Sequence, residues 1–309
     1  MATASYSVQA PRAVIMVRPH HFTVNTETAA DNRFQVVSDG SPRQSQLAYD
    51  EITRAADTLR SHGVTVHLFE DEGLDTPDSV FPNNWFSTHA GGHVAIYPMK
   101  AVSRRRERRA DVIALLKDSY RVQDIIDYSG LEPDGLFLEG TGAMVLDHLD
   151  RVAYVVRSDR ADPIALERFA THFNFEPMVF DAVDGDGVPV YHTNVLMCVA
   201  TSFAMIGTEM ITNAERRAEI IARLQQSGRE IIHLSTAQIG QFAGNALELQ
   251  GTEGRILALS TTALASLTDD QRRVIEASAR IVSLDIPTIE QAGGSVRCTL
   301  AGVCLTPRS

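Results

Sequence analysis

Hydrophobic positions along this chain recur with two spacings that alternate from one end to the other. The spacing of one apolar helix face occurs in Gln44–Ser61, Arg105–Lys117, Ala165–Phe173, Ala214–Gln226 and Thr268–Ala279. A short strand-like run follows each helix: Val64–Phe69, Arg121–Ile126, Glu176–Phe180, Glu230–Leu234 and Ile281–Leu284. The pattern predicts a mixed α/β fold in which every helix leads into a strand.

Pairs of apolar strands come before most of these helices. The pairs are Val80–Ser87 with His93–Tyr97, Gly142–Leu146 with Arg151–Val156, Val195–Ala200 with Phe203–Ile206, and, more weakly, Ala246–Gln250 with Ile256–Ser260. A further unit would join the two chain ends, with Ser295–Thr299 and Gly302–Thr306 beside Ala13–Val17. The chain therefore reads as five strand–strand–helix–strand repeats.

Such a repeat favours a closed ring of small sheets with helices outside, although the same alternation also permits an ordinary open α/β sheet. No long linker rich in proline, glycine and serine divides residues 1–309, so we expect one domain. Strand ends and loops of a ring converge on a central channel, which is where ligands bind. Functional residues are expected at equivalent strand ends of different repeats.

The composition limits the classes of function. Hydrophobic residues make up 44% and charged residues 22%, and the net charge of 28 minus 39, or -11, argues against a general nucleic-acid binder. Three cysteines fit a reducing compartment without a disulfide framework. No secretory signal begins the sequence, and no apolar run approaches the roughly 18 residues of a membrane helix. We expect a cytoplasmic protein that does not associate with membranes.

The three cysteines differ in their surroundings. Cys298 follows the pair Gly293-Gly294 and lies between Arg297 and Thr299. This context suits a reactive thiol, with a small core residue as the alternative. Cys198 and Cys304 lie in apolar runs and read as core residues.

Two other polar residues stand at strand mouths. His192 comes just before the apolar run Val195–Ala200 and is placed to exchange protons, or simply to cap the strand. Glu139 follows two large apolar residues and precedes Gly140, so it is expected to be partly buried and to need a partner. The partner is either a substrate N–H group or a backbone turn.

The remaining polar clusters have ordinary readings as well. Asp78–Trp85 is a polar segment at a strand start, typical of a loop. The run Arg104–Arg109 reads as a solvated helix face, from which one member could turn inward to a carboxylate. The polar segment His20–Asn32 is a candidate lid. No CxxC or HExxH motif occurs, so no metal site is expected.

Together these motifs resemble the guanidine-modifying (pentein) superfamily, which includes arginine deiminases, dimethylarginine dimethylaminohydrolases and amidinotransferases. The nearest likeness is to bacterial proteins of citrulline utilisation, and it runs from Arg18-Pro19 to the Cys298 segment. The resemblance implies a five-bladed α/β propeller of ββαβ modules. It also implies a catalytic set of Cys298 as nucleophile, His192 as acid and base, and Glu139 as the substrate-binding carboxylate.

The resemblance implies substrate-binding residues too. Asp78 would meet an α-amino group, and Arg160 in Ser158-Asp159-Arg160 would bind an α-carboxylate, with Arg104 or Arg105 as weaker candidates. Members that process arginine often have aspartates where this chain has Asn84, whose alignment is shared with Asn83, and Asn194.

Those asparagines suggest a substrate. A guanidinium carries only donors and prefers carboxylates, whereas an asparagine offers a donor and an acceptor that suit a neutral ureido group. We therefore expect hydrolysis of citrulline to ornithine, carbon dioxide and ammonia through a covalent intermediate on Cys298. No metal or organic cofactor is needed, because the thiolate and imidazole supply the chemistry.

Other functions stay open. The nearest are deimination or dihydrolysis of arginine, hydrolysis of dimethylarginine, and amidino transfer, in which an amine replaces water at the intermediate. A module that senses amino acids, or a structural relative of a translation factor, would have no need of a cysteine, histidine and glutamate together. The expected partner is a small amino acid, and self-association as a homo-oligomer is left open.

Overall fold

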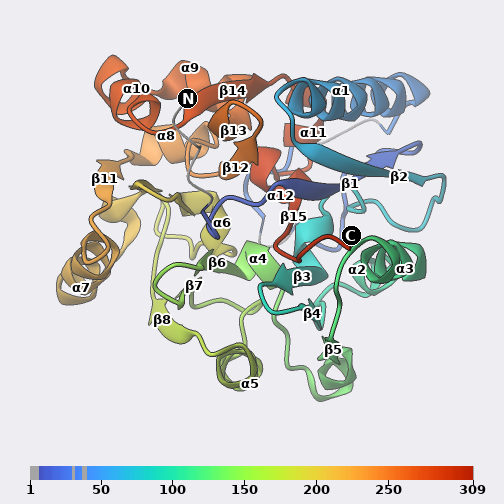
Figure 1. The fold of residues 1–309 in the computed structure, drawn as a ribbon, viewed down its shortest axis with the longest axis horizontal. Coiled ribbons are helices and arrows are strands. Elements are labelled where there is room, and N and C mark those ends of the chain that lie inside the picture. The colour runs from blue at the N-terminus through green and yellow to red at the C-terminus, as the bar shows by residue number, and fades with distance from the viewer. Residues whose placement is uncertain (1–6, 30–31, 37–39, 309) are drawn as a thin grey trace.

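Five sheets of three strands each surround a common centre in the described part of the chain (Figure 1). The computed structural model describes residues 7–29, 32–36 and 40–308. Every sheet is built the same way: an inner strand pairs antiparallel with a middle strand, and the middle strand pairs parallel with an outer strand. The predicted α/β propeller of ββαβ modules is confirmed.

The five modules follow one another along the chain, except that the first unites the two ends. In the order inner strand, middle strand, helix, outer strand, they are β15 (Ala301–Val303), β1 (Ala13–Pro19), α1 (Pro42–Ser61), β2 (Thr65–Asp71); β3 (Phe86–His89), β4 (His93–Ile96), α3 (Ala110–Ser119), β5 (Asp124–Asp127); β6 (Met144–Asp147), β7 (Val152–Val156), α5 (Pro163–Phe173), β8 (Glu176–Phe180); β9 (Met197–Val199), β10 (Phe203–Ile206), α7 (Ala214–Gln225), β11 (Glu230–His233); and β12 (Leu247–Gly251), β13 (Gly254–Ser260), α10 (Asp269–Glu276), β14 (Arg280–Leu284).

Short helices complete the structure. They are η1 (Pro82–Asn84), α2 (Val102–Arg105), η2 (Ser129–Asp134), α4 (Gly140–Ala143), α6 (Thr193–Leu196), η3 (Thr208–Met210), α8 (Thr236–Gly240), α9 (Thr261–Ser266), α11 (Pro287–Glu290) and α12 (Val296–Thr299). The inner strands contact one another around the ring, β15 with β3, β6 with β9, and β9 with β12. The short helices η1, α4, α6 and α12 lie near the centre, and α1, α3, α5, α7 and α10 lie outside (Figure 1).

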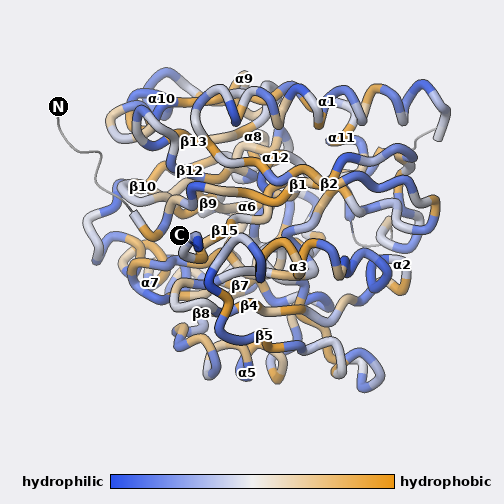
Figure 2. The backbone as a smooth tube through the Cα atoms, turned by 45° about the vertical axis from the view of Figure 1, so that its right-hand side comes forward, coloured by the Kyte–Doolittle hydropathy of each residue, from blue (hydrophilic) through white to orange (hydrophobic). Residues whose placement is uncertain are grey.

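The long helices cover the sheets with one apolar face each. In α1 the buried positions Ala48, Ile52, Ala55 and Leu59 recur every three or four residues, and β1 and β2 contact this face. Helix starts are specified locally: Asp162 accepts hydrogen bonds from the first turn of α5, and Thr268 forms a capping box at α10. Figure 2 shows the apolar strands inside and the polar helix surfaces outside.

The middle strands are buried on both faces. All five residues of β7 are buried, as expected for a strand between an outer helix and the neighbouring modules. Side chains from these strands and the covering helices form four apolar clusters around the ring. These clusters fix the modules against each other, so that loops at the inner strand ends are held in place.

Some predicted boundaries were wrong, and the errors share a cause. Val80–Ser87, Gly142–Leu146, Val195–Ala200 and Ser295–Thr299 were predicted as strands, but each includes a short helical turn, η1, α4, α6 or α12. Such a turn is apolar enough to look like a strand, since both pack in the core. The predicted helix Arg105–Lys117 is divided into α2 and α3, because Arg104 turns into the core and pairs with Glu107.

No helix among residues 7–29, 32–36 and 40–308 is long and apolar enough to span a membrane.

Candidate active site

Each inner strand is preceded by a turn that presents polar side chains to the centre of the ring. The turns carry Asn84 in η1, Glu139 before α4, His192 before α6, Asn245 before β12 and Cys298 in α12. All five side chains are almost completely buried. Equivalent positions in five repeats thus bring together residues that are distant in sequence.

Cys298 lies between two side-chain amides. The Nδ2 groups of Asn194 and Asn245 each donate to its sulfur at 3.3 Å. Asn245 also donates to the carbonyl of Asn194 at 3.0 Å, which ties the two turns together. The Oδ1 atoms of both asparagines are buried without a hydrogen-bond partner in the described structure. The sulfur therefore faces N–H donors, and two amide oxygens are left to accept hydrogen bonds.

The sequence analysis missed Asn245. It lies just before β12, where Asn84 lies before β3 and Asn194 before β9. Aligning the repeats with one another would have singled it out. The β12–β13 pair was the weakest of the predicted pairs, and no single motif marks the segment Gly244-Asn245.

His192 and Glu139 form a buried pair. Nε2 of His192 lies 2.9 Å from Oε2 of Glu139, and Nη1 of Arg160 lies 3.3 Å from the same oxygen. Burial by itself raises the pKa of Glu139, but Arg160, the hydrogen bond from His192 and Arg104 outweigh it and hold the pKa well below its usual range. Glu139 is therefore ionised near neutral pH.

The ionised carboxylate determines the state of the imidazole. Burial lowers the pKa of His192 to about 4, although Glu139 opposes the shift. The ring is therefore neutral near pH 7. With Glu139 accepting at Nε2, the ring proton lies on Nε2 and the lone pair on Nδ1. This is the tautomer of a general base that is oriented by a carboxylate.

A second charged cluster borders the same space. Asp78 Oδ2 accepts a hydrogen bond from Asn25 at 2.8 Å and lies 3.7 Å from Nε of Arg104, while its Oδ1 is buried without a partner in the described structure. Burial raises the pKa of Asp78, with Arg104 and Asn25 opposing the rise. Burial opposes the charge of Arg104, but Glu107 and Asp78 raise its pKa above the ordinary value.

A small enclosed space, the Cys298 cavity, joins these groups. Its volume is about 20 Å³, roughly enough for one water molecule. Its walls are formed by Thr28, Asn32, Asp78, Phe81, Asn84, Arg104, Arg160, Tyr191, His192, Ala292, Gly293, Gly294 and Cys298. Thr28 and Asn32 belong to the predicted lid segment, whose residues 30 and 31 lie outside the described residues. This segment closes the space and has to move before a ligand the size of an amino acid can enter.

Close packing of the turns requires glycine at one central position. A Cβ atom on Gly142 would lie 2.2 Å from Nδ2 of Asn84 and 2.9 Å from Nδ1 of His192. Real side chains do not approach so closely, so any larger residue displaces the imidazole or the amide. Gly142 thereby allows the turns of three modules to meet.

Most of the predicted site residues come together, with two exceptions. Asn83 is fully buried beside the cavity but does not line it, and both polar atoms of its side chain are buried without partners in the described structure. Arg105 points elsewhere: it donates to the Met99 carbonyl at 3.0 Å and lies 3.5 Å from Glu132. Of the two adjacent candidates, Arg104 is the one that reaches the cavity, because α2 turns its neighbour outward.

A family model described as "N,N dimethylarginine dimethylhydrolase, eukaryotic" matches residues 18–305 of this chain. The match includes all ten predicted site residues. Comparison with curated proteins found no match.

Solved structures of similar fold include enzymes of arginine metabolism. A substituted N-terminal domain of ArgZ bound to substrate, an arginine dihydrolase from cyanobacteria, aligns with a TM-score of 0.74 and 16% identity over 94% of this chain and 97% of that chain. Unliganded AgrE gives 0.75 and 16%, over 96% of this chain and 40% of its own. A dimethylarginine dimethylaminohydrolase variant with an S-methyl-L-thiocitrulline adduct gives 0.64 and 13%, over 94% and 99%. At these identities the likeness establishes the fold.

Proposed function

This chain belongs to the N,N-dimethylarginine dimethylhydrolase family of pentein hydrolases, which act on C–N bonds of guanidino groups, and we propose that it hydrolyses the terminal C–N bond of a ureido or guanidino amino acid. The observation that carries the proposal is the Cys298 cavity. It places a thiol, a neutral imidazole oriented by an ionised carboxylate, and charged groups of both signs around one enclosed space.

Cys298 is the proposed nucleophile. Nδ1 of His192 takes the thiol proton, and the sulfur attacks the ureido carbon to form a C–S bond. The Nδ2 groups of Asn194 and Asn245 are donors close to the reacting centre, and such donors stabilise developing negative charge. His192 then returns the proton to the departing amine as the C–N bond breaks. Water, deprotonated by His192, hydrolyses the S-carbamoyl intermediate.

Glu139 has a different proposed role from the one that the resemblance implied. Its carboxylate accepts hydrogen bonds from His192 and Arg160 and, at 3.1 Å, from the backbone N–H of Lys100. With these contacts it holds the ring tautomer and stabilises the imidazolium that forms after proton transfer. Binding of substrate N–H groups is secondary.

The far end of the cavity suits the α-amino and α-carboxylate groups of an amino acid. Oδ1 of Asp78 is the acceptor we assign to the ammonium group. The guanidinium groups of Arg104 and Arg160, which both line the cavity, supply the positive potential for the carboxylate. Asn84 lies between Arg104 and the Glu139 backbone, at 3.5 Å from each, and spaces the two ends.

Citrulline is the substrate we favour. The side chains on the sulfur are neutral amides rather than carboxylates, and their free Oδ1 atoms match the two N–H donors of a terminal ureido amide. The products would be ornithine, carbon dioxide and ammonia, since the carbamate released by water breaks down. All three cysteines are free thiols, which suits a reducing cytoplasm.

Arginine is the second candidate. Solved structures similar to this chain include an arginine dihydrolase, and the ionised Glu139 together with Asp78 gives the cavity carboxylates for a guanidinium. Dihydrolysis would pass through the same bond-breaking step twice, and its products would be ornithine and two molecules of ammonia per arginine.

The test is incubation of the purified protein with citrulline, arginine, dimethylated arginines and agmatine, followed by mass spectrometry of the products. Ornithine from citrulline, formed faster than any product from arginine, supports the favoured substrate. Faster conversion of arginine refutes it and leaves the hydrolase. An added amine acceptor distinguishes transfer from hydrolysis, because transfer gives a new amidino compound.

A matched pair of variants checks the site itself. Arg104→Gln should raise KM strongly, whereas Arg105→Gln, which removes the same charge outside the cavity, should leave it nearly unchanged. No turnover of any of these compounds by the wild-type protein would overturn the proposal.

A further inference from the structure

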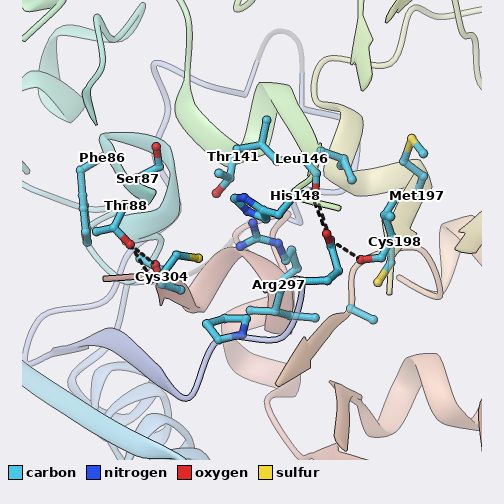
Figure 3. Close-up of a pocket in the computed structure, with 18 residues that line it drawn as sticks. Phe86, Ser87, Thr88, Thr141, Leu146, His148, Met197, Cys198, Arg297 and Cys304 are labelled. Atoms are coloured by element: carbon cyan, nitrogen blue, oxygen red, sulfur yellow. Dashed lines mark hydrogen bonds between the residues drawn. The ribbon is translucent and has the colours of Figure 1, made fainter. Parts of the chain in front are cut away.

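A second cavity, the Arg297 cavity, shares no lining residue with the Cys298 cavity (Figure 3). Its volume is about 50 Å³. Its walls come from β3, β6, β9, β12 and β15, from α4 and α12, and from the segment before β1. It therefore lies among the inner strands of all five modules, beside the candidate nucleophile in sequence but not in the same space.

The cavity holds a guanidinium without a counterion. Within the described residues Arg297 forms no ion pair, and its one hydrogen bond runs from Nη1 to the Leu300 carbonyl at 2.8 Å. A guanidinium carries five N–H donors, so four have no protein acceptor. Burial lowers the pKa of Arg297, yet an arginine keeps its proton in proteins. Such a charge requires compensation.

The other lining groups carry no negative charge. Burial raises the pKa of Cys198 to about 12 and that of Cys304 to about 11, so both are neutral thiols near pH 7. Burial lowers the pKa of His148 to about 4, with Arg151 and Arg297 adding to the effect, so its ring is neutral as well. Figure 3 shows His148 directly beside Arg297.

The neutral acceptors are already used. Oε1 of Gln9 accepts from the backbone of His148 at 2.7 Å, and its Nε2 donates to the carbonyls of Leu146 and Val199. Oγ1 of Thr88 accepts from the backbone of Cys304 at 2.8 Å and donates to the Gly302 carbonyl. The unused polar groups are thus the guanidinium donors and the His148 ring, a set that favours an anion over a cation.

We propose that the Arg297 cavity is a binding site for a small inorganic anion of the size of chloride or bicarbonate. A cavity of 50 Å³ has room for about three or four waters, which excludes nucleotides and amino acids. The guanidinium supplies the charge and a fork of donors. The neutral imidazole of His148 supplies a further N–H.

The anion regulates the nucleophile, a consequence that rests on the proposed role of Cys298. Arg297 interacts electrostatically with the sulfur of Cys298, as well as with Cys198 and Cys304. A cation beside a thiol favours the thiolate. An anion bound to Arg297 cancels that charge, so Cys298 becomes less reactive although the Cys298 cavity is unchanged.

The binding test needs no turnover. Crystals of the protein soaked in sodium bromide should show an anomalous scattering peak beside the Arg297 guanidinium, and crystals of Arg297→Gln should show none there. Arg12→Gln, which removes a charge from an exposed position, is the matched control and should keep the peak. A wild-type structure without bromide at Arg297 overturns the site.

The regulatory test measures alkylation of Cys298 by iodoacetamide, followed by mass spectrometry of its peptide. Saturating bromide or bicarbonate should slow the wild-type reaction by about fivefold, while sodium gluconate at equal ionic strength, whose anion is too large for the cavity, should leave it unchanged. The Arg297→Gln protein should react slowly in every salt, and Arg12→Gln should behave as wild type.

These outcomes separate the two proposals. Bromide bound at Arg297 and slowed alkylation, in a protein that hydrolyses none of the amino acids above, support the anion site while the proposed function fails. Equal slowing by gluconate, or slowing that persists in Arg297→Gln, shows a general salt effect and overturns the regulation.

Discussion

The Cys298 cavity and the Arg297 cavity are formed by the same repeats and by consecutive residues of one short helix, yet their charges are opposite in character. In the Cys298 cavity both guanidinium groups lie against carboxylates, Arg160 against Glu139 and Arg104 against Asp78. In the Arg297 cavity a single guanidinium has no carboxylate partner among the described residues. Side chains of adjacent helical residues point about 100° apart, so neighbours in sequence serve different spaces.

The comparison teaches that the repeat provides positions and the side chains provide chemistry. In the first space, burial is offset by paired charges that set a neutral histidine and an ionised glutamate. In the second, burial is not offset, and we assign the missing charge to a solute. The following experiments test this division, beginning with the largest effect.

The sulfur atoms should differ most. Cys298→Ala is expected to lower turnover by roughly 10⁴-fold or more, because no other group can form the covalent intermediate. Cys304→Ala, which removes a thiol from the Arg297 cavity, should keep turnover within a few-fold of wild type. Steady-state rates for both variants check this, with circular dichroism as the control for folding. Equal rates for Cys298→Ala and wild type would remove the covalent mechanism.

Two histidines with similar pKa values should also separate. His192→Gln removes the proposed general base and is expected to lower kcat by roughly 10³-fold. His148→Gln removes a neutral ring from the Arg297 cavity and should change kcat only slightly. Comparable losses in the two variants would show that the histidines are not divided between a catalytic and a structural role.

The glycine at the meeting point of the turns is the next test. Gly142→Ala places a methyl group against Asn84 and His192, and a displacement of about 1 Å at a catalytic group can cost roughly 10²-fold in rate. Gly130→Ala is the matched control, since no atom lies within 4 Å of its added Cβ. The ratio of the two kcat values measures the effect, and a ratio near one contradicts it.

Acid stability reports on the uncompensated cavity. The pKa of His148 is lowered to about 4 in the folded protein from 6.5, so between these values the unfolded chain binds a proton that the folded chain does not. The free energy of unfolding therefore falls as pH decreases from 6.5 to 4. Because the ring is partly accessible, we expect a contribution of about 2 kcal/mol at most.

Denaturant titrations of wild type and His148→Gln across this range measure that contribution. The variant should lose less stability on acidification, and the difference should level off below pH 4 and above 6.5. A difference that does not change with pH would show that the His148 ring titrates normally.

The smallest effect is expected for the residue that only the structure revealed. Asn245→Ala removes one of two N–H donors to the Cys298 sulfur, and with Asn194 still in place we expect a loss of about tenfold in kcat. Asn83→Ala, at a buried asparagine outside the cavity, is the control and should leave kcat unchanged. If Asn83→Ala causes the larger loss, the assignment of the two asparagines is reversed.

Much of the fold was predictable because helices and strands have different hydrophobic periods. The helix of Ala165–Phe173 and the strand of Glu176–Phe180 were located almost to the residue. The short turns before the inner strands were not, because one buried helical turn has no period long enough to distinguish it from a strand. Residues in these turns carry the candidate site, so the errors fell where the chemistry lies.

The sequence by itself determined the five-fold repeat, the closure of the first sheet by the two chain ends, and the candidacy of Cys298, His192 and Glu139. Hydrophobic spacing and residue type are local properties, and a single chain displays them directly. Only the tertiary structure decided that Arg104 faces the cavity and Arg105 does not, that Asn245 lies on the sulfur, and that Arg297 has no carboxylate partner in the described residues. Those facts depend on distances between residues far apart in sequence, which packing of the five modules sets and no local pattern records.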